Sequence, residues 1–341
     1  MNDRVSYIDC IKGIGICFVL FAHLIPFDYF PSIHICSEAI YMPIFFIISG
    51  FLTTNLELST IHKRINKLFL SYIFFSILLL VAGALGAYDV GKNTILGLLY
   101  SRSEIIWEGE TIWLLKFPFG PLWFITAMIS MYFVLHVLLK CRIKNLWSIF
   151  FISITLALGI ARLDCRLPWS FDNALLFLGF FITGQILRKI NIIDKIKVIV
   201  AALGVIIFIW SSLHNGKVNL SMNVYGNNFL LGVFNAILGT ILLMWISKRI
   251  VNHLSNSVIN LMLFIGRNSL AIFCTHMGIY MFFQNIFDIC FSNVTSYQSD
   301  HQYWQFALIV IVLAITLLIS NKLNELCSLF VRRVNDFIGH K

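Results

Sequence analysis

Residues 9–23 read DCIKGIGICFVLFAH, an apolar run that contains three ionisable side chains, Asp9, Lys12 and His23. In a helix, Lys12 and His23 lie about 20° apart around the axis and roughly 16 Å apart along it. Asp9 precedes Lys12 by one turn on the same face, where it neutralises the amine. Ionisable groups inside a membrane are costly and usually face a bundle interior or an aqueous cavity, so this face is a candidate functional site. The alternative is a buried ion pair that only fixes packing, with His23 at the interface.

The composition indicates an integral membrane protein. Of 341 residues, 59% are hydrophobic and 12% are charged, and the mean hydropathy is +0.86, far from the balance of a soluble domain. Spans of about 20 residues with short connections allow roughly ten helices. We therefore expect an all-α, polytopic membrane helix bundle. The absence of a basic stripe with interleaved aromatic residues argues against nucleic acid, and the scattered cysteines argue against disulfides and a metal site.

Apolar runs near spanning length, cut at charges, prolines and polar loops, predict ten spans. They cover residues 8–26, 36–53, 68–87, 121–139, 146–161, 172–187, 198–213, 229–246, 268–287 and 304–321. A short segment, 258–265, is expected to lie along the interface or to re-enter. With the N-terminus inside, 19 of the 25 lysines and arginines fall on the inner side. The outer six are Lys92, Arg102, Lys116, Arg162, Arg166 and Lys217. This bias predicts that both termini are cytoplasmic.

Basic residues at the inner ends of the first spans indicate a ligand that carries phosphate. Lys12, Arg64 and Lys67 fall at this level, and Arg64 and Lys67 are spaced i and i+3 on one helical face. Such a cationic mouth suits phosphate groups held by charge-assisted hydrogen bonds. A topology signal with contacts to anionic membrane lipids is the alternative interpretation.

His23 falls near the outer end of the first span. An imidazole titrates near neutral pH, so it is able to accept a proton from a hydroxyl and return it to a leaving group. Glu38 and Asp172 fall at a similar depth and are candidates to orient the ring, although a carboxylate there is more often only interfacial. On composition alone, His276 is interpreted as a satisfied bundle histidine and Trp123 as an aromatic-belt anchor.

Six segments, ordered along nearly the whole chain, carry a family resemblance. They are YIDCIKGIGICFVLFAH (7–23), MPIFFIISGFL (42–52), RINK (64–67), GPLWF (120–124), DNALLFLGFFITGQILR (172–188) and the stretch from Arg267 to His276. Together they resemble the membrane-bound acyltransferase family 3, particularly its fucose 4-O-acetylase-like and surface-polysaccharide O-acetyltransferase branch. The pattern departs at Tyr41, where relatives often have histidine, and at Ser71, where they often have proline.

The resemblance implies a single acyltransferase-3-like transmembrane domain over residues 1–341, multi-pass in the inner (plasma) membrane. It also implies transfer of an acyl group, usually acetyl from acetyl-CoA, to a hydroxyl of a cell-envelope sugar or lipid-linked glycan, without a metal. The predicted catalytic residues are His23 as general base, Glu38 and Asp172. The predicted donor-binding residues are Lys12, Arg64, Lys67 and Arg267. The predicted acceptor contacts are Trp123, His276 and Tyr41.

Two alternatives stay open from the sequence. Within the enzyme class, a covalent acetyl-imidazole on His23 is the less favoured variant of direct transfer, and it would suit transfer across the bilayer. From a different class, a transporter or flippase would move a glycan or lipid without chemistry. Polar residues within spans, namely Gln185, Asn235 and His276, would then line its path.

Overall fold

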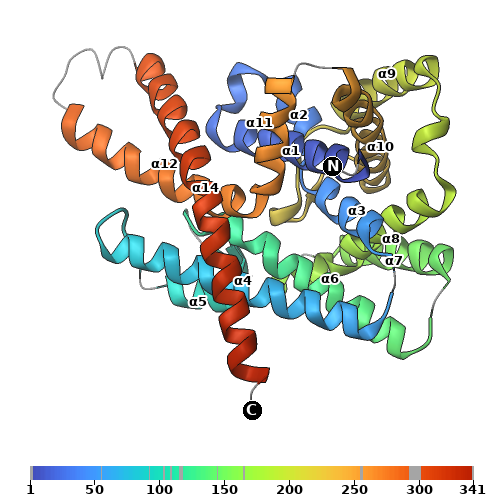
Figure 1. The fold of residues 1–341 in the computed structure, drawn as a ribbon, viewed down its shortest axis with the longest axis horizontal. Helices are drawn as coiled ribbons and strands as arrows, with labels where there is room; N and C mark the ends of the chain where they lie inside the picture. The colour runs from blue at the N-terminus through green and yellow to red at the C-terminus, as the bar shows by residue number, and fades with distance from the viewer. Residues whose placement is uncertain are drawn as a thin grey trace. The chain divides into compact units, whose positions relative to one another are not determined.

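The chain is built almost entirely of helices (Figure 1). The computed structural model describes residues 3–54, 56–91, 93–102, 104–107, 110–114, 118–143, 145–163, 166–253, 256–291 and 301–339. The chain divides into two compact units, each assembled from two separate parts of the sequence. Unit 1 comprises residues 1–66 and 127–269, and unit 2 comprises residues 67–126 and 270–341. The single domain expected over the whole chain stays a prediction.

Unit 1 holds most of the helices. They are α1 (Asp3–Leu24), η1 (Phe27–Tyr29), α2 (Pro31–Glu38), α3 (Pro43–Leu52), the start of α4 (Leu58–Ala84), most of α6 (Trp123–Lys140), α7 (Leu146–Ile160), η3 (Pro168–Asn173), α8 (Ala174–Ile190), η4 (Ile193–Lys195), α9 (Val198–Asn215), α10 (Phe229–His253) and α11 (Asn256–Arg267). Between α9 and α10, a short antiparallel pair forms from β3 (Val218–Asn219) and β4 (Val224–Tyr225) around η5 (Leu220–Met222).

Unit 2 contains the rest of α4, α5 (Thr94–Tyr100), the antiparallel hairpin of β1 (Glu104–Trp107) and β2 (Glu110–Trp113), η2 (Gly120–Leu122), α12 (Ser269–Phe291) and α14 (His301–Gly339). The stretch over residues 88–120, which lies between two expected spans, therefore includes a helix and a hairpin. Helix α14 packs along α4, where the rings of Phe330 and Phe74 lie 5.7 Å apart and Cys327 Sγ lies 3.6 Å from Ser71 Oγ.

The predicted fold class is confirmed, because nine helices within the described ranges are long and apolar enough to cross a membrane. The expected span at 146–161 corresponds to α7, whose 15 residues rise about 22 Å, less than the roughly 30 Å of a hydrocarbon core. Helix α14 runs 39 residues, well past the predicted end at residue 321. Lys322 does not end it, because its ammonium pairs with Glu325 one turn later at 3.5 Å.

Glycines allow the closest helix packing in unit 1. A β-carbon at Gly50 of α3 or at Gly184 of α8 would overlap a backbone carbonyl oxygen of the other helix. Helices α1 and α11 approach one another in the same way through Gly13 and Gly266. Small residues at such crossings are typical of membrane helices, because van der Waals contact replaces the hydrophobic effect as the attraction between them. The segment expected at 258–265 is therefore a helix that packs against α1.

Candidate functional site

His23 lies in the last turn of α1, beside Tyr41 between α2 and α3. The two rings are 6.5 Å apart between centroids in an edge-on arrangement, with Tyr41 buried and His23 half-buried. The Tyr41 phenol is in turn within electrostatic range of the Glu38 carboxyl, at the end of α2. These three residues, here the His23 cluster, place an imidazole, a phenol and a carboxyl group in one region of unit 1. Such groups are able to hold and move a proton.

Both carboxylates predicted to orient His23 meet residues 216–228, here the α9–α10 segment. The Glu38 carboxylate accepts a hydrogen bond from the backbone N–H of Val218 and lies within electrostatic range of Lys217. Asp172 Oδ2 accepts a hydrogen bond from Asn223 Nδ2 at 2.5 Å. The segment is therefore fixed through two acidic side chains, and their predicted action on His23 stays a prediction.

Asn173 strengthens this attachment at the N-terminus of α8. Its Nδ2 donates to the carbonyl oxygen of Leu220 at 3.1 Å and to Asn223 Oδ1 at 2.6 Å, and its Oδ1 accepts from the Tyr225 hydroxyl at 2.5 Å. Sequence reasoning missed Asn173 and its partners. A signal was present, because residues 215–228 contain five asparagines, which favour turns and side-chain hydrogen bonds to the backbone.

His34, a second histidine that sequence reasoning passed over, is 1% exposed in α2. Its ring packs 4.6 Å from that of Phe21 in α1 and 5.5 Å from that of Phe27 in η1, between centroids. These contacts join the end of α1 to α2. His34 therefore supports the framework that carries the His23 cluster.

Two of the predicted donor-binding cations converge on Asp9. Its Oδ1 lies 3.5 Å from Lys12 Nζ, and its Oδ2 lies 3.4 Å from Arg267 Nε at the end of α11. The predicted pairing of Asp9 with Lys12 is confirmed, and α11 adds a second cation. Asp9 is buried, whereas the side chains of Lys12 and Arg267 are 27% and 48% exposed. This trio, the Asp9 cluster, carries one net positive charge and is suited to an anion.

Arg64, near the start of α4, binds two hydroxyl groups. Its Nη1 donates to the Tyr132 hydroxyl at 2.8 Å and to Ser49 Oγ at 3.4 Å, and the two hydroxyls are themselves 2.6 Å apart. Among the described residues Arg64 has no carboxylate partner. The guanidinium charge is therefore not compensated within this part of the protein and is suited to an anionic group.

A second arginine lies at the same end of α3. Arg188 Nη1 donates to the carbonyl oxygen of Phe51 at 3.1 Å, and Gln185 Nε2 donates to those of Gly50 and Thr53 at 2.7 and 2.5 Å. These side chains of α8 satisfy carbonyl groups that a helix terminus leaves without intrahelical partners. Arg64 and Arg188 thus both bind the last turn of α3, at the negative end of its dipole.

The remaining predicted site residues belong to unit 2. Lys67 is exposed on α4, one turn after Arg64, and Trp123 is buried at the start of α6. His276 is fully buried in α12, where its Nδ1 lies 3.1 and 2.9 Å from the carbonyl oxygens of Ile272 and Phe273. That geometry places the proton of a neutral ring on Nδ1, as in a bundle histidine that serves packing. Roles of Trp123 and His276 toward an acceptor stay predictions.

The helical bundle, with its long apolar helices, defines a polytopic membrane protein. A family model described as "Acyltransferase domain" matches residues 5–321. The chain belongs to the acyltransferase 3 family, as the resemblance predicted, and is therefore a membrane acyltransferase. Neither the curated proteins nor the solved structures give a significant match.

Proposed function

We propose that the protein transfers an acetyl group from acetyl-CoA to a hydroxyl of a cell-envelope sugar or lipid-linked glycan. The observation that carries the proposal is the continuity of α1 from Asp3 to Leu24. This helix carries Lys12 in the Asp9 cluster and His23 in the His23 cluster. The two residues are separated by roughly 16 Å of helix rise and share a face. A donor with phosphates at one end and a thioester at the end of a long arm matches that separation.

The donor phosphates are proposed to bind the cations of unit 1. Lys12 and Arg267 supply the excess charge of the Asp9 cluster, and Arg64 supplies an uncompensated guanidinium. Lys67 extends the same face of α4 by one turn. Arginine suits this role because its planar fork matches two phosphate oxygens at once. The excess of positive residues on one predicted side supports a plasma-membrane protein that takes its donor from the cytoplasm.

His23 is proposed as the general base. It takes the proton of the sugar hydroxyl while the oxygen attacks the thioester carbonyl carbon, forming the new C–O bond. The C–S bond then breaks, and the protonated imidazole returns its proton to the departing thiolate. Tyr41 lies edge-on to the His23 ring, and Glu38 is within electrostatic range of Tyr41. These two neighbours are proposed to orient the ring and to stabilise its charged form. We assign them positioning roles.

The transporter alternative gains no support from its proposed path. Gln185 uses its amide on the carbonyl oxygens of α3, and His276 directs Nδ1 to its own helix. Asn235 is fully buried, with its Oδ1 accepting from Ser211 at 2.6 Å. These are interactions that stabilise a helix bundle.

A transfer assay tests the proposal. The purified protein in lipid nanodiscs is incubated with radiolabelled acetyl-CoA and an envelope lipid extract, and we expect label in the glycan fraction. His23→Gln keeps a polar side chain but removes the base, so transfer should fall by about 10²- to 10⁴-fold with the thermal midpoint unchanged. If His23→Gln were as active as the wild type, His23 would not be the general base. Absence of label in every acceptor fraction would contradict acetyl transfer to an envelope glycan and would favour a transporter.

A further inference from the structure

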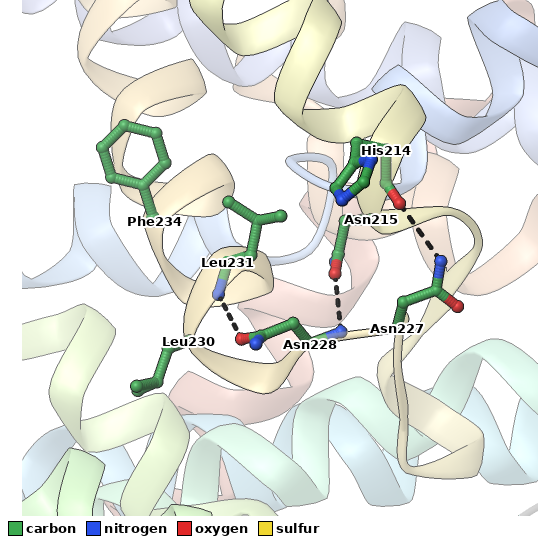
Figure 2. A pocket seen from close by; sticks show the side chains of 7 residues that line it. All are labelled: His214, Asn215, Asn227, Asn228, Leu230, Leu231 and Phe234. Atoms are coloured by element: carbon green, nitrogen blue, oxygen red, sulfur yellow. Dashed lines mark hydrogen bonds between the residues drawn. The ribbon is translucent and has the colours of Figure 1, made fainter.

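A pocket in unit 1 lies where α9 ends and α10 begins, and none of the proposed catalytic or donor-binding residues lines it. Its volume is about 430 Å³, within the range of ligand pockets. Figure 2 shows polar side chains on one side and apolar side chains on the other. The lining residues are His214, Asn215, Asn227, Asn228, Leu230, Leu231 and Phe234.

The polar side is a fixed framework with spare hydrogen-bonding groups. Asn228 N–H donates to Asn215 Oδ1 at 2.8 Å, and Asn228 Oδ1 accepts from the N–H of Leu231 at 3.1 Å, which caps α10 (Figure 2). Asn227 Nδ2 donates to the carbonyl oxygen of His214 at 3.1 Å. Asn228 Nδ2, Asn227 Oδ1 and the His214 ring nitrogens have no hydrogen bond to the described residues. They remain available to a ligand.

The apolar side of the pocket faces lipid. Leu230 and Phe234 are 53% and 46% exposed, although they lie on α10, a helix apolar enough to span the membrane. Exposed apolar residues on such a helix face lipid. On α9, Trp210 is stacked on the His214 ring at 5.7 Å, an aromatic pair typical of the membrane interface. The pocket therefore opens to both water and lipid, as an amphipathic ligand requires.

The pocket and the His23 cluster are joined by the α9–α10 segment. Its last residues, Asn227 and Asn228, frame the pocket, and its first residues, Lys217 and Val218, interact with Glu38. Both features belong to unit 1. An acceptor held in the pocket would thus be bound by the segment that also holds Glu38.

We propose that this pocket binds the acceptor as a glycolipid, an inference that rests on the proposed function. Neutral amide groups and an imidazole match the alternating donors and acceptors of sugar hydroxyls. The lining contains no lysine or arginine, which favours the sugar over a lipid phosphate as the group bound there. The first methylenes of the lipid chain pack on Leu230 and Phe234, on the side that faces lipid.

Photolabelling without acetyl-CoA tests binding directly. The probe is a glucosyl lipid with a diazirine in its alkyl chain, presented to the protein in nanodiscs, and we expect label on residues 227–234. Phe234→Ala should reduce that label about tenfold, equivalent to about 1.4 kcal/mol. The control is Phe151→Ala on α7, because Phe151 is 61% exposed and lies outside the pocket.

A competition experiment tests specificity for the sugar. Excess unlabelled glucosyl lipid should compete with the probe, and phosphatidylcholine should not. Equal competition by phosphatidylcholine, or equal labelling of both variants, would overturn the proposal.

Kinetics separate this proposal from the proposed function. Asn228→Ser keeps an oxygen that caps α10 but removes the amide Nδ2, so KM for the glycolipid acceptor should rise several-fold with KM for acetyl-CoA unchanged. If His23-dependent transfer occurs but the acceptor KM of Asn228→Ser is that of the wild type, the pocket assignment fails and the function stands. If the wild type binds the probe in the pocket but transfers no acetyl group, the proposed function fails and glycolipid binding stands.

Discussion

The Asp9 carboxylate is the ion-pair partner of two cations in unit 1, Lys12 and Arg267. Asp9→Asn would leave Lys12 and Arg267 without their carboxylate inside the bundle. We expect a loss of about 1 to 3 kcal/mol in unfolding free energy, less than for a fully buried pair because both cations are partly exposed. Thermal unfolding in detergent measures it. The control, Glu325→Gln, breaks the exposed pair with Lys322 and should stay within about 0.5 kcal/mol of the wild type. Equal stability of both variants would contradict the role of Asp9.

Arg64 should act on donor binding more than on stability. Arg64→Gln removes the uncompensated charge, so KM for acetyl-CoA is expected to rise roughly tenfold, the value of one charge-assisted hydrogen bond. Steady-state transfer kinetics at several salt concentrations measure the change, and the salt dependence of KM should weaken. Lys140→Gln, which removes an exposed cation at the end of α6, is the control. An unchanged KM for acetyl-CoA in Arg64→Gln would show that Arg64 does not bind the donor.

Asp194 gives a pH-dependent prediction outside the spans. A hydrogen bond from Lys248 lowers the pKa of the Asp194 carboxyl. A carboxyl with a lower pKa in the folded state stabilises the fold at neutral pH and loses that contribution as the pH falls through the folded pKa. Both side chains are more than 40% exposed, so the effect is below about 1 kcal/mol. Asp194→Asn should therefore lower the thermal midpoint slightly at pH 7, and the difference from the wild type should disappear as the pH falls below the usual carboxyl range and through the lowered pKa of Asp194.

The crossing of α3 and α8 is tight enough to give a steric prediction. Gly184→Ala places a methyl group on the backbone of α3, so the helices must separate, and we expect a loss of about 1 to 3 kcal/mol. Gly159→Ala on α7 is the matched control, because no atom lies within 4 Å of its β-carbon position. That control should be neutral or slightly stabilising, since alanine favours helix more than glycine. Thermal unfolding measures both variants, and equal stability of Gly184→Ala and Gly159→Ala would contradict the close crossing of α3 and α8.

Hydropathy predicted most of the spanning helices, because a run of apolar side chains is a local property of the sequence. It did not predict α5 or the β1–β2 hairpin, since the stretch over residues 88–120 has no apolar run of spanning length. It placed the end of the last span at residue 321, where polar residues begin, whereas the helix itself continues to Gly339 with an ion pair between Lys322 and Glu325. Element boundaries depend on such pairs and on neighbours from other parts of the chain.

The same distinction applies to the candidate site. Helical spacing predicted the pairing of Asp9 with Lys12 because both lie on one helix. The second partner, Arg267, is 258 residues away in the sequence and enters only when α11 packs against α1. The contacts of Glu38 and Asp172 with the α9–α10 segment have the same origin, because tertiary packing creates them. Local reasoning therefore finds candidate side chains, and the fold determines which of them meet.

The number of membrane crossings depends on α7. Nine helices of the described part have spanning length, and α7 is shorter at 15 residues. If α7 crosses, the ten crossings place both termini on one side, as the distribution of lysine and arginine predicts. A helix of about 22 Å is able to cross if the bilayer thins or flanking side chains extend to the interface. If α7 does not cross, every later helix reverses its direction.

Two native cysteines distinguish these topologies without any mutation. Cys141 and Cys290 are both exposed, the first between α6 and α7 and the second near the end of α12. Ten crossings place Cys141 inside and Cys290 outside, so of these two a membrane-impermeant maleimide added to intact cells should modify only Cys290, as read by peptide mapping. Permeabilised cells, in which both should react, provide the control. With nine crossings the two cysteines share a compartment, so reaction of both, or of neither, in intact cells would show that α7 does not span and that the termini lie on opposite sides.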